Sequence, residues 1–173
     1  MILIGIGANL TGPHGDSPLD TVRWASIQLN RLFSLNLRGL SRWYRTEPLP
    51  PSEQPFYVNG VAHLAVPAGR LEPEPAELLI GLQAIEAQAG RVRAERNAAR
   101  TLDLDIIAMG EGGQTVQATP DPILPHPRAH MRAFVLMPLL EVAPTWVHPS
   151  FRRSARELLT ALPDQNVQPI EVN

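Results

Sequence analysis

Two acidic residues spaced two apart in an apolar segment are the first candidates for chemistry in this sequence. Asp103 and Asp105 alternate with the apolar side chains of segment 102–106. Successive side chains of a β-strand point to opposite faces, so this alternation places both carboxylates on one face. The two like charges repel each other and raise the pKa of one carboxyl unless a cation binds. Mg²⁺ is a suitable cation, because it binds one or two carboxylates together with phosphate oxygens and water. Two solvated acids neutralised by nearby arginines are the alternative.

An arginine-rich segment directly precedes the acidic pair. Its arginines are Arg91, Arg93, Arg96 and Arg100. The guanidinium group is suited to binding two phosphate oxygens at once, so a magnesium–nucleotide complex fits this neighbourhood. All 15 basic residues of the chain are arginine, which excludes a lysine Schiff base and a Walker lysine. We expect segment 91–100 to be mobile until phosphates supply its missing counter-charges.

Two other segments carry side chains suited to a heterocyclic ligand. His126 lies between two prolines and is followed by Arg132 and Phe134. Tyr57 and Asn59 share one face of an expected strand. An asparagine amide pairs with the amide-like edge of a heterocycle, and an aromatic ring stacks on its face. Ordinary core packing is the alternative for Tyr57.

The composition is that of one globular domain spanning residues 1–173. The 44% of hydrophobic residues support a core without disulfides, and the absence of cysteine excludes thiolate chemistry. The net charge of −2 offers no polycationic surface for nucleic acid.

No apolar segment is long enough to span a membrane and the N-terminus does not resemble a signal peptide, so we expect a cytoplasmic protein. We expect a monomer, with a dimer as the alternative. The spacing of His126 and His130 fits a zinc pair, but no third ligand is evident.

The elements that position these residues follow from hydrophobic periodicity and from helix start and stop signals. Ser17, Pro18 and Asp20 form a helix start, and Gly90 ends a later helix. The Gly5-x-Gly7 sequence is expected to end a buried strand that leads into a tight turn, rather than to form a phosphate loop. Strands are expected over 2–7, 36–46, 56–66 and 102–109, and helices over 17–34, 74–89, 129–142 and 153–161. This β-α-β-β-α-β order predicts an α+β, ferredoxin-like fold with a mainly antiparallel sheet flanked by helices in three layers.

The candidate residues belong to an ordered set of motifs. In chain order these are Ile4-Gly5-Ile6-Gly7-Ala8-Asn9-Leu10, Tyr44-Arg45-Thr46-Glu47-Pro48, Gln54-Pro55-Phe56-Tyr57-Val58-Asn59, Ile85-Glu86-Ala87-Gln88-Ala89-Gly90-Arg91, Arg100-Thr101-Leu102-Asp103-Leu104-Asp105-Ile106, Leu124-Pro125-His126-Pro127 and Arg132-Ala133-Phe134-Val135-Leu136-Met137-Pro138-Leu139. The set resembles the 6-hydroxymethyl-7,8-dihydropterin pyrophosphokinase family of folate biosynthesis. The resemblance covers about residues 1–160 and leaves 161–173 as a tail without an assigned role.

The resemblance implies an ATP-dependent enzyme that transfers a pyrophosphoryl group to the hydroxymethyl group of a dihydropterin and releases AMP. It implies that Asp103 and Asp105 hold two Mg²⁺ ions, and that Arg91 and Arg100 bind the phosphates and stabilise the charge that develops on them. The other residues that it assigns to the ATP site are Gln83, Glu86, Arg93, Ile106, His126 and Arg132. The residues that it assigns to the pterin site are Thr46, Pro48, Leu49, Tyr57, Asn59 and Phe134, with the rings of Tyr57 and Phe134 on either side of the pterin.

The sequence departs from the family pattern in the arginine-rich segment. Asn97 stands where the family commonly has a tryptophan, and the segment is one residue shorter. Because the metal ligands and principal phosphate arginines are retained, we expect activity with an altered lid. A non-catalytic nucleotide- or pterin-binding homologue is one alternative. A ferredoxin-like RNA-binding module is another, although paired acids in a central strand are unlike the aromatic and basic sheet of such modules.

Overall fold

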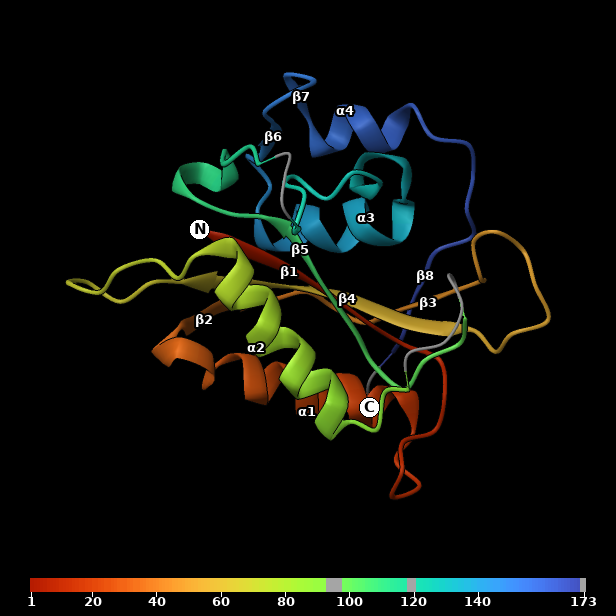
Figure 1. Cartoon of the computed structure of the whole chain (residues 1–173). Coiled ribbons are helices and arrows are strands. Elements are labelled where there is room, and N and C mark those ends of the chain that lie inside the picture. Colours follow the sequence, from red (N-terminus) through yellow and green to blue (C-terminus); the bar gives the residue numbers. More distant parts are fainter. Residues whose placement is uncertain (93–97, 118–120, 172–173) are drawn as a thin grey trace.

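A sheet of six strands forms the middle layer of the molecule (Figure 1). The computed structural model describes residues 1–92, 98–117 and 121–171. The strand order is β5-β1-β4-β3-β8, with β2 also paired to β4, and every strand pair described in this sheet is antiparallel. The bounds are β1 Ile2–Ala8, β2 Asn36–Leu40, β3 Tyr44–Thr46, β4 Tyr57–Ala65, β5 Asp103–Ala108 and β8 Gln168–Pro169.

Helices cover both faces of this sheet, so the expected three-layer α+β architecture is confirmed. Helices α1 (Pro18–Leu29) and α2 (Pro75–Gln88) lie on one side, and α3 (Ala133–Val142) and α4 (Ala155–Thr160) lie on the other (Figure 1). Short 3₁₀ helices span Leu32–Ser34, Glu111–Gly113 and Ala129–Met131, and β6 (Val147–His148) pairs with β7 (Arg153–Ser154) in a separate hairpin. Among the described residues, no helix is long and apolar enough to cross a membrane.

Alternation along the strands divides the buried side chains into two cores. Ile4 and Ile6 of β1 pack with Leu82 of α2 on one face. Leu3 of β1 packs with Leu136 of α3 on the opposite face. Burying these side chains removes apolar surface from water and fixes which face each strand turns toward each helix layer.

The N-terminal and C-terminal signals of the helices are confirmed. The Ser17 side chain accepts a hydrogen bond from the Asp20 N–H at the start of α1, at 3.2 Å. Gly90 follows the end of α2 with a φ of 74°, a conformation that glycine adopts without steric cost. Helix α2 therefore delivers the chain into the arginine-rich segment at a defined point.

Three expected element boundaries differ from the structure. The first helix ends at Leu29 and is followed by a separate 3₁₀ turn. The expected strand over 36–46 is divided into β2 and β3, where the Ser41 hydroxyl accepts a hydrogen bond from the Val61 N–H at 2.9 Å. The expected helix over 129–142 is broken at Arg132, whose φ of −123° and ψ of 106° are extended. In the C-terminal tail, β8 adds an edge strand that periodicity did not predict.

Candidate functional site

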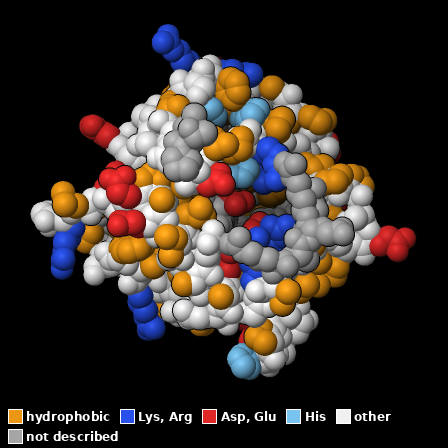
Figure 2. Space-filling view, viewed as in Figure 1, with side chains coloured by type: hydrophobic (Ala, Val, Ile, Leu, Met, Phe, Trp, Pro, Cys, Tyr) orange, Lys and Arg blue, Asp and Glu red, His pale blue; other side chains and the backbone are white. Residues whose placement is uncertain are grey.

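A cavity of about 260 Å³ opens on the face of the sheet that carries α3. Its walls come from β1, β4, β5, the segment after β3 and the start of α3. The volume lies just below the usual range of about 300–1,000 Å³ for small-molecule sites. Figure 2 shows a hollow in the molecular surface where acidic, basic and histidine side chains meet. The cavity is therefore both concave and strongly polar.

The acidic pair of β5 lines this cavity as the alternation predicts. Asp103 and Asp105 face the cavity, whereas Leu104, which is 3% exposed, packs in the core beneath them. Gly7 and Gly5 of β1 pair with Asp103 and Asp105 and also line the cavity. The expected strand over 2–7 is confirmed and continues to Ala8, so both glycines lie within β1. Because Gly7 has no Cβ, the Asn59 side chain can approach β1, where a Cβ would lie 2.8 Å from Asn59 Oδ1.

Both oxygens of the Asp103 carboxylate are bound by guanidinium groups. An Arg91 nitrogen lies 2.7 Å from Oδ1, and an Arg100 nitrogen lies 2.8 Å from Oδ2. Arg91 also pairs with Glu86, which is only 4% exposed and accepts a hydrogen bond from the Leu104 N–H at 2.8 Å. Glu86 is therefore buried between its helix and β5 rather than exposed to solvent. Its buried carboxylate joins α2, Arg91 and β5.

Asp105 is in a different electrostatic state from Asp103. Burial and the neighbouring Asp103 carboxylate raise the pKa of Asp105 to about 6. The His126 Nε2 lies 3.8 Å from Asp105 Oδ2. Burial and the guanidinium groups of Arg132 and Arg128 lower the pKa of His126 to about 4, so this imidazole is neutral near pH 7. Its Nδ1 accepts a hydrogen bond from the Arg128 N–H at 3.1 Å, which leaves the proton on Nε2 facing Asp105.

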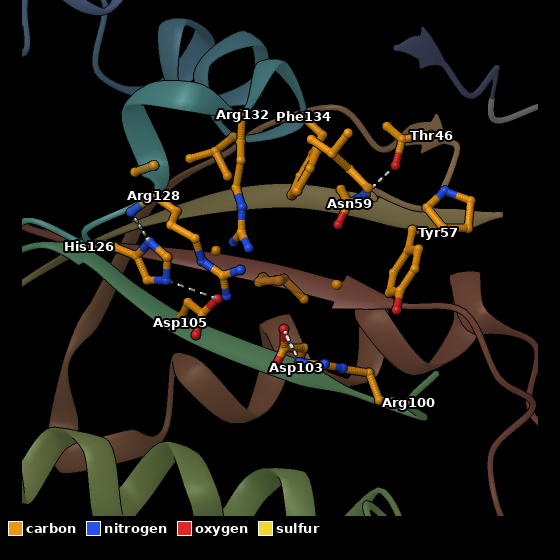
Figure 3. A pocket seen from close by; sticks show the side chains of 18 of the residues that line it. Thr46, Tyr57, Asn59, Arg100, Asp103, Asp105, His126, Arg128, Arg132 and Phe134 are labelled. Carbon is orange, nitrogen blue, oxygen red and sulfur yellow. Dashed lines mark hydrogen bonds and ion pairs between the residues drawn. The ribbon is translucent and has the colours of Figure 1, made fainter. Parts of the chain in front are cut away.

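Arginines form the wall opposite the acidic pair. Figure 3 shows the side chains of Arg128 and Arg132 extending toward Asp105. Burial and the nearby Arg128 charge lower the pKa of Arg132, so this cation lacks full compensation in the ligand-free protein. Arg128 was not among the residues predicted for the site. The signal that could have identified it is its place directly after the Pro-His-Pro sequence of 125–127.

The remaining wall carries groups suited to a heterocycle. The Asn59 Nδ2 donates a hydrogen bond to Thr46 Oγ1 at 2.7 Å, and the Asn59 carbonyl oxygen points into the cavity (Figure 3). The Tyr57 hydroxyl donates to Gln54 Oε1 at 3.2 Å, and burial raises its pKa. The rings of Tyr57 and Phe134 both line the cavity.

Asn9 is a further residue that supports the site and was not predicted from the sequence. It is 2% exposed, and its Oδ1 accepts a hydrogen bond from the Arg100 N–H at 2.8 Å. Its Nδ2 donates to the Pro55 carbonyl at 3.2 Å. Asn9 thereby holds the segment of Arg100 next to the segment that precedes Tyr57. Only its place in the first family-like motif indicated it.

The cavity brings together most of the residues predicted from the sequence. Those that line it are Thr46, Pro48, Leu49, Tyr57, Asn59, Arg91, Arg100, Asp103, Asp105, His126, Arg132 and Phe134. Gln83 and Glu86 lie outside the lining, although Glu86 contacts Arg91. Ile106 is 3% exposed and packs in the core, whereas its neighbour Ile107 lines the cavity. Arg93, Arg96 and Asn97 lie outside the described residues, as does the middle part, 93–97, of the segment expected to be mobile.

The zinc alternative gains no support from the described residues. The His130 ring packs against the rings of Phe151 and His148, with centroid distances of 4.6 and 5.9 Å. Within segments 1–92, 98–117 and 121–171, no group of three or more His, Asp or Glu side chains is arranged to hold a metal ion.

Comparisons with known proteins agree with this geometry. A family model described as 7,8-dihydro-6-hydroxymethylpterin-pyrophosphokinase (HPPK) matches residues 3–144. A Synechocystis protein named 2-amino-4-hydroxy-6-hydroxymethyldihydropteridine pyrophosphokinase is 37% identical over 168 residues, covering 97% of this chain and 79% of the relative. A Pseudomonas aeruginosa protein of the same name is 38% identical over 169 residues, covering 96% of this chain and 94% of the relative.

A solved structure shows the same fold. It is titled as an HPPK-DHPS in complex with substrates, and it matches with a TM-score of 0.60 at 13% identity. The match covers 92% of this chain and 43% of the longer solved chain. The family match and the two bacterial relatives show that the chain belongs to the 7,8-dihydro-6-hydroxymethylpterin-pyrophosphokinase family.

Proposed function

We propose that this chain transfers pyrophosphate from ATP to 6-hydroxymethyl-7,8-dihydropterin, giving AMP and the pterin diphosphate. The observation that carries the proposal is one cavity that joins an acidic pair, an arginine wall and a heterocycle pocket. The relatives at 37% and 38% identity carry the name of this enzyme. In the reaction, the hydroxymethyl oxygen of the pterin bonds to the β-phosphorus of ATP, and the bond from that phosphorus to the α,β-bridging oxygen breaks.

The arginines are the residues that bind and neutralise the triphosphate. Arg91 and Arg100 pair with Asp103 in the ligand-free protein, and phosphate oxygens compete for the same guanidinium groups. Arg132 lies deeper in the wall, where its incompletely compensated charge favours an anion. In phosphoryl-type transfer most of the catalysis comes from positioning and from charges placed before the reaction begins. The neutral His126 supplies an N–H donor beside these cations.

The acidic pair fits the magnesium ions that the family resemblance implies. Two carboxylates share one face of β5, and their mutual repulsion contributes to the raised pKa of Asp105. A divalent cation relieves this repulsion and leaves coordination positions for phosphate oxygens and water. We propose that Asp103 and Asp105 hold two Mg²⁺ ions. Bound there, Mg²⁺ would neutralise phosphate charge and stabilise both the attacking and the leaving oxygen.

The pterin occupies the pocket between β4 and the start of α3. Because Asn59 donates its amide N–H to Thr46, its carbonyl oxygen is directed at the cavity as an acceptor for a pterin N–H. The rings of Tyr57 and Phe134 supply apolar faces for the bicyclic ring system. Pro48 and the half-exposed Leu49 close the outer edge of this pocket.

The test is to incubate the protein with Mg-ATP and the hydroxymethyl dihydropterin and to measure AMP. The Asp103→Ala/Asp105→Ala double variant is the control, because it removes both carboxylates from the cavity. We expect AMP formation by the wild-type protein that depends on the pterin and is lost in the double variant. Nucleotide binding without AMP above the control would instead favour the non-catalytic homologue.

We further propose that the protein acts as a monomer in the cytoplasm. Light scattering coupled to size-exclusion chromatography should give a mass near the 19.0 kDa of a single chain. Fractionation of cells that express the protein should recover it with the cytoplasmic contents. A mass of two chains would favour the dimer.

A further inference from the structure

The C-terminal tail makes a two-point contact with the backbone on either side of Arg132. The Gln165 Oε1 accepts a hydrogen bond from the Ala133 N–H at 2.8 Å. The Gln165 Nε2 donates a hydrogen bond to the Met131 carbonyl at 2.9 Å. One amide group therefore bonds both residues that flank Arg132. The region matched by the family model ends at residue 144, before this glutamine.

Helix α3 explains why this contact is needed. Its N-cap residue is Arg132, which makes no side-chain capping hydrogen bond. An N-cap serine, threonine, aspartate or asparagine would normally accept a hydrogen bond from the first turn. Here the N-cap side chain extends into the cavity instead (Figure 3). Gln165 supplies an acceptor to the first residue of α3 from 32 positions further along the chain.

The electrostatics of Arg132 make its backbone support important. Burial and the nearby Arg128 lower its pKa, so the direction of this side chain into the cavity has an electrostatic cost. The rotamers that a side chain can adopt depend on the φ and ψ of its residue. Hydrogen bonds on both sides of the residue restrict φ and ψ there, and precise sites depend on such supporting contacts.

The same tail also contacts the segment after β3, which forms another wall of the cavity. The Asn166 Nδ2 donates a hydrogen bond to Glu47 Oε1 at 3.0 Å, and Glu47 lines the cavity. Two residues later β8 pairs with β3, with Gln168 opposite Arg45. The segment 165–169 therefore connects the Arg132 wall to the strand that carries Thr46. The hydrogen bonds of Gln165 hold one end of this segment, and the pairing of β8 with β3 holds the other.

We propose that Gln165 is a positioning residue for substrate binding, which acts by fixing the backbone around Arg132. This inference rests on the proposed function, in which Arg132 binds the nucleotide. Gln165 does not line the cavity and acts only through the residues it holds. The C-terminal tail is accordingly part of the binding apparatus.

The first experiment is to replace Gln165→Met, which keeps the side-chain length and removes both hydrogen bonds. Binding of a non-hydrolysable ATP analogue with Mg²⁺ is measured by isothermal titration calorimetry. We expect about tenfold weaker binding, the effect of one to two lost hydrogen bonds. Circular dichroism at the assay temperature checks that the variant is folded. Gln88→Met, at an exposed position on α2, is the matched control and should bind like the wild type.

A double-mutant cycle separates positioning from a general loss of structure. Arg132→Ala removes the side chain that Gln165 positions. Once it is removed, adding Gln165→Met should weaken binding little further, because the two changes affect one interaction. If the two losses multiply instead, or if Gln165→Met binds like the wild type, the proposal is overturned. If Gln165→Met does not fold, Gln165→Glu retains the acceptor for Ala133, and an intermediate loss of affinity is expected.

The outcomes for Gln165 and for the proposed function are distinct. If the wild type produces AMP and Gln165→Met binds the ATP analogue as tightly as the wild type does, only the proposed role of Gln165 is refuted. If the wild type binds the analogue without producing AMP, the proposed reaction is refuted. The comparison of binding between the wild type and Gln165→Met still tests the role of Gln165. If the wild type binds no ATP analogue, both are overturned.

Discussion

Asp105 carries an electrostatic cost in the ligand-free protein. Burial and the Asp103 carboxylate raise its pKa from 3.8 to about 6. A carboxyl group whose pKa is raised on folding stabilises the fold when it is protonated, so stability is lost as the pH rises through about 6. An uncharged amide at this position avoids that loss.

We therefore predict that Asp105→Asn is more stable than the wild type at alkaline pH. The side chain is 44% exposed, and water in the cavity screens its charge, so the gain is about 1 kcal/mol or about 2–4 °C in Tm. Urea denaturation at about pH 8 and about pH 4 measures it. The gain should nearly vanish at the lower pH, where the wild-type carboxyl is protonated in the folded state. An equal gain at both pH values would refute an electrostatic cause.

The two cavity glycines of β1 differ in what a methyl group would meet. A Cβ at Gly7 would lie 2.8 Å from Asn59 Oδ1, whereas a Cβ at Gly5 would lie 3.5 Å from the nearest atom, in Ile107. We predict that Gly7→Ala displaces the Asn59 amide and weakens pterin binding about tenfold, the cost of about one misplaced hydrogen bond. Fluorescence titration with the pterin measures the affinity. Gly5→Ala is the matched control, and a loss as large as that of Gly7→Ala would contradict the role of Asn59.

At the scale of elements, Glu141 of α3 is joined to the strand that leads into the pterin pocket. Its carboxylate accepts hydrogen bonds from the Arg42 N–H at 2.8 Å and from the Tyr44 hydroxyl. Burial raises the pKa of Glu141, but the hydrogen bonds from Arg42 and Tyr44 outweigh burial and lower it. The Arg42 side chain is 66% exposed, so its ion pair contributes little, whereas Tyr44 is 2% exposed and needs a partner.

We predict that Glu141→Ala destabilises the protein by about 1–3 kcal/mol, because it leaves the buried Tyr44 hydroxyl without an acceptor. Glu141→Gln keeps an acceptor oxygen while removing the charge, so it should cost less. Urea denaturation of the two variants compares these effects. If both variants lost the same stability, the ion pair with Arg42 would be the important contact after all.

The strand that carries the acidic pair could be predicted because its pattern is local. Alternation along 102–106 places Asp103 and Asp105 on one face whatever the rest of the chain does. The break between β2 and β3 depends instead on partners distant in sequence. There the Ser41 hydroxyl bonds to the Val61 N–H, and the Trp43 ring lies against Gly60. The periodicity of hydrophobic residues along the chain does not predict contacts between such distant segments.

The same distinction explains the errors at the site. The burial of Glu86 could not be predicted from its place on α2. It depends on Arg91 and on the Leu104 N–H, which both lie outside that helix. Arg128 was not predicted because it lines the cavity only when segments distant in sequence fold together around it. Strand β8 spans two residues, too few for any hydrophobic period to show.

At the scale of the whole molecule, charge is unevenly distributed. The chain has a net charge of −2, yet Arg91, Arg100, Arg128 and Arg132 all line one cavity. Asp103, Asp105 and Glu47 line the same cavity, and Glu86 pairs with Arg91 from outside the lining. The cavity therefore concentrates charges of both signs on a protein of small net charge, and its arginines act on a charged ligand more than on a neutral one.

We predict that salt weakens nucleotide binding and leaves pterin binding unchanged. The screening length falls from about 10 Å at about 0.1 M salt to about 3 Å at about 1 M, so attraction between the arginines and a triphosphate decreases while contacts of the uncharged pterin do not. Calorimetric titration across this range, at fixed free Mg²⁺, should show ATP-analogue affinity falling severalfold. Arg128→Gln should reduce the salt dependence, and Arg156→Gln, on the exposed surface of α4, should not. Equal salt dependence for both ligands would mean that the cavity arginines do not set nucleotide affinity.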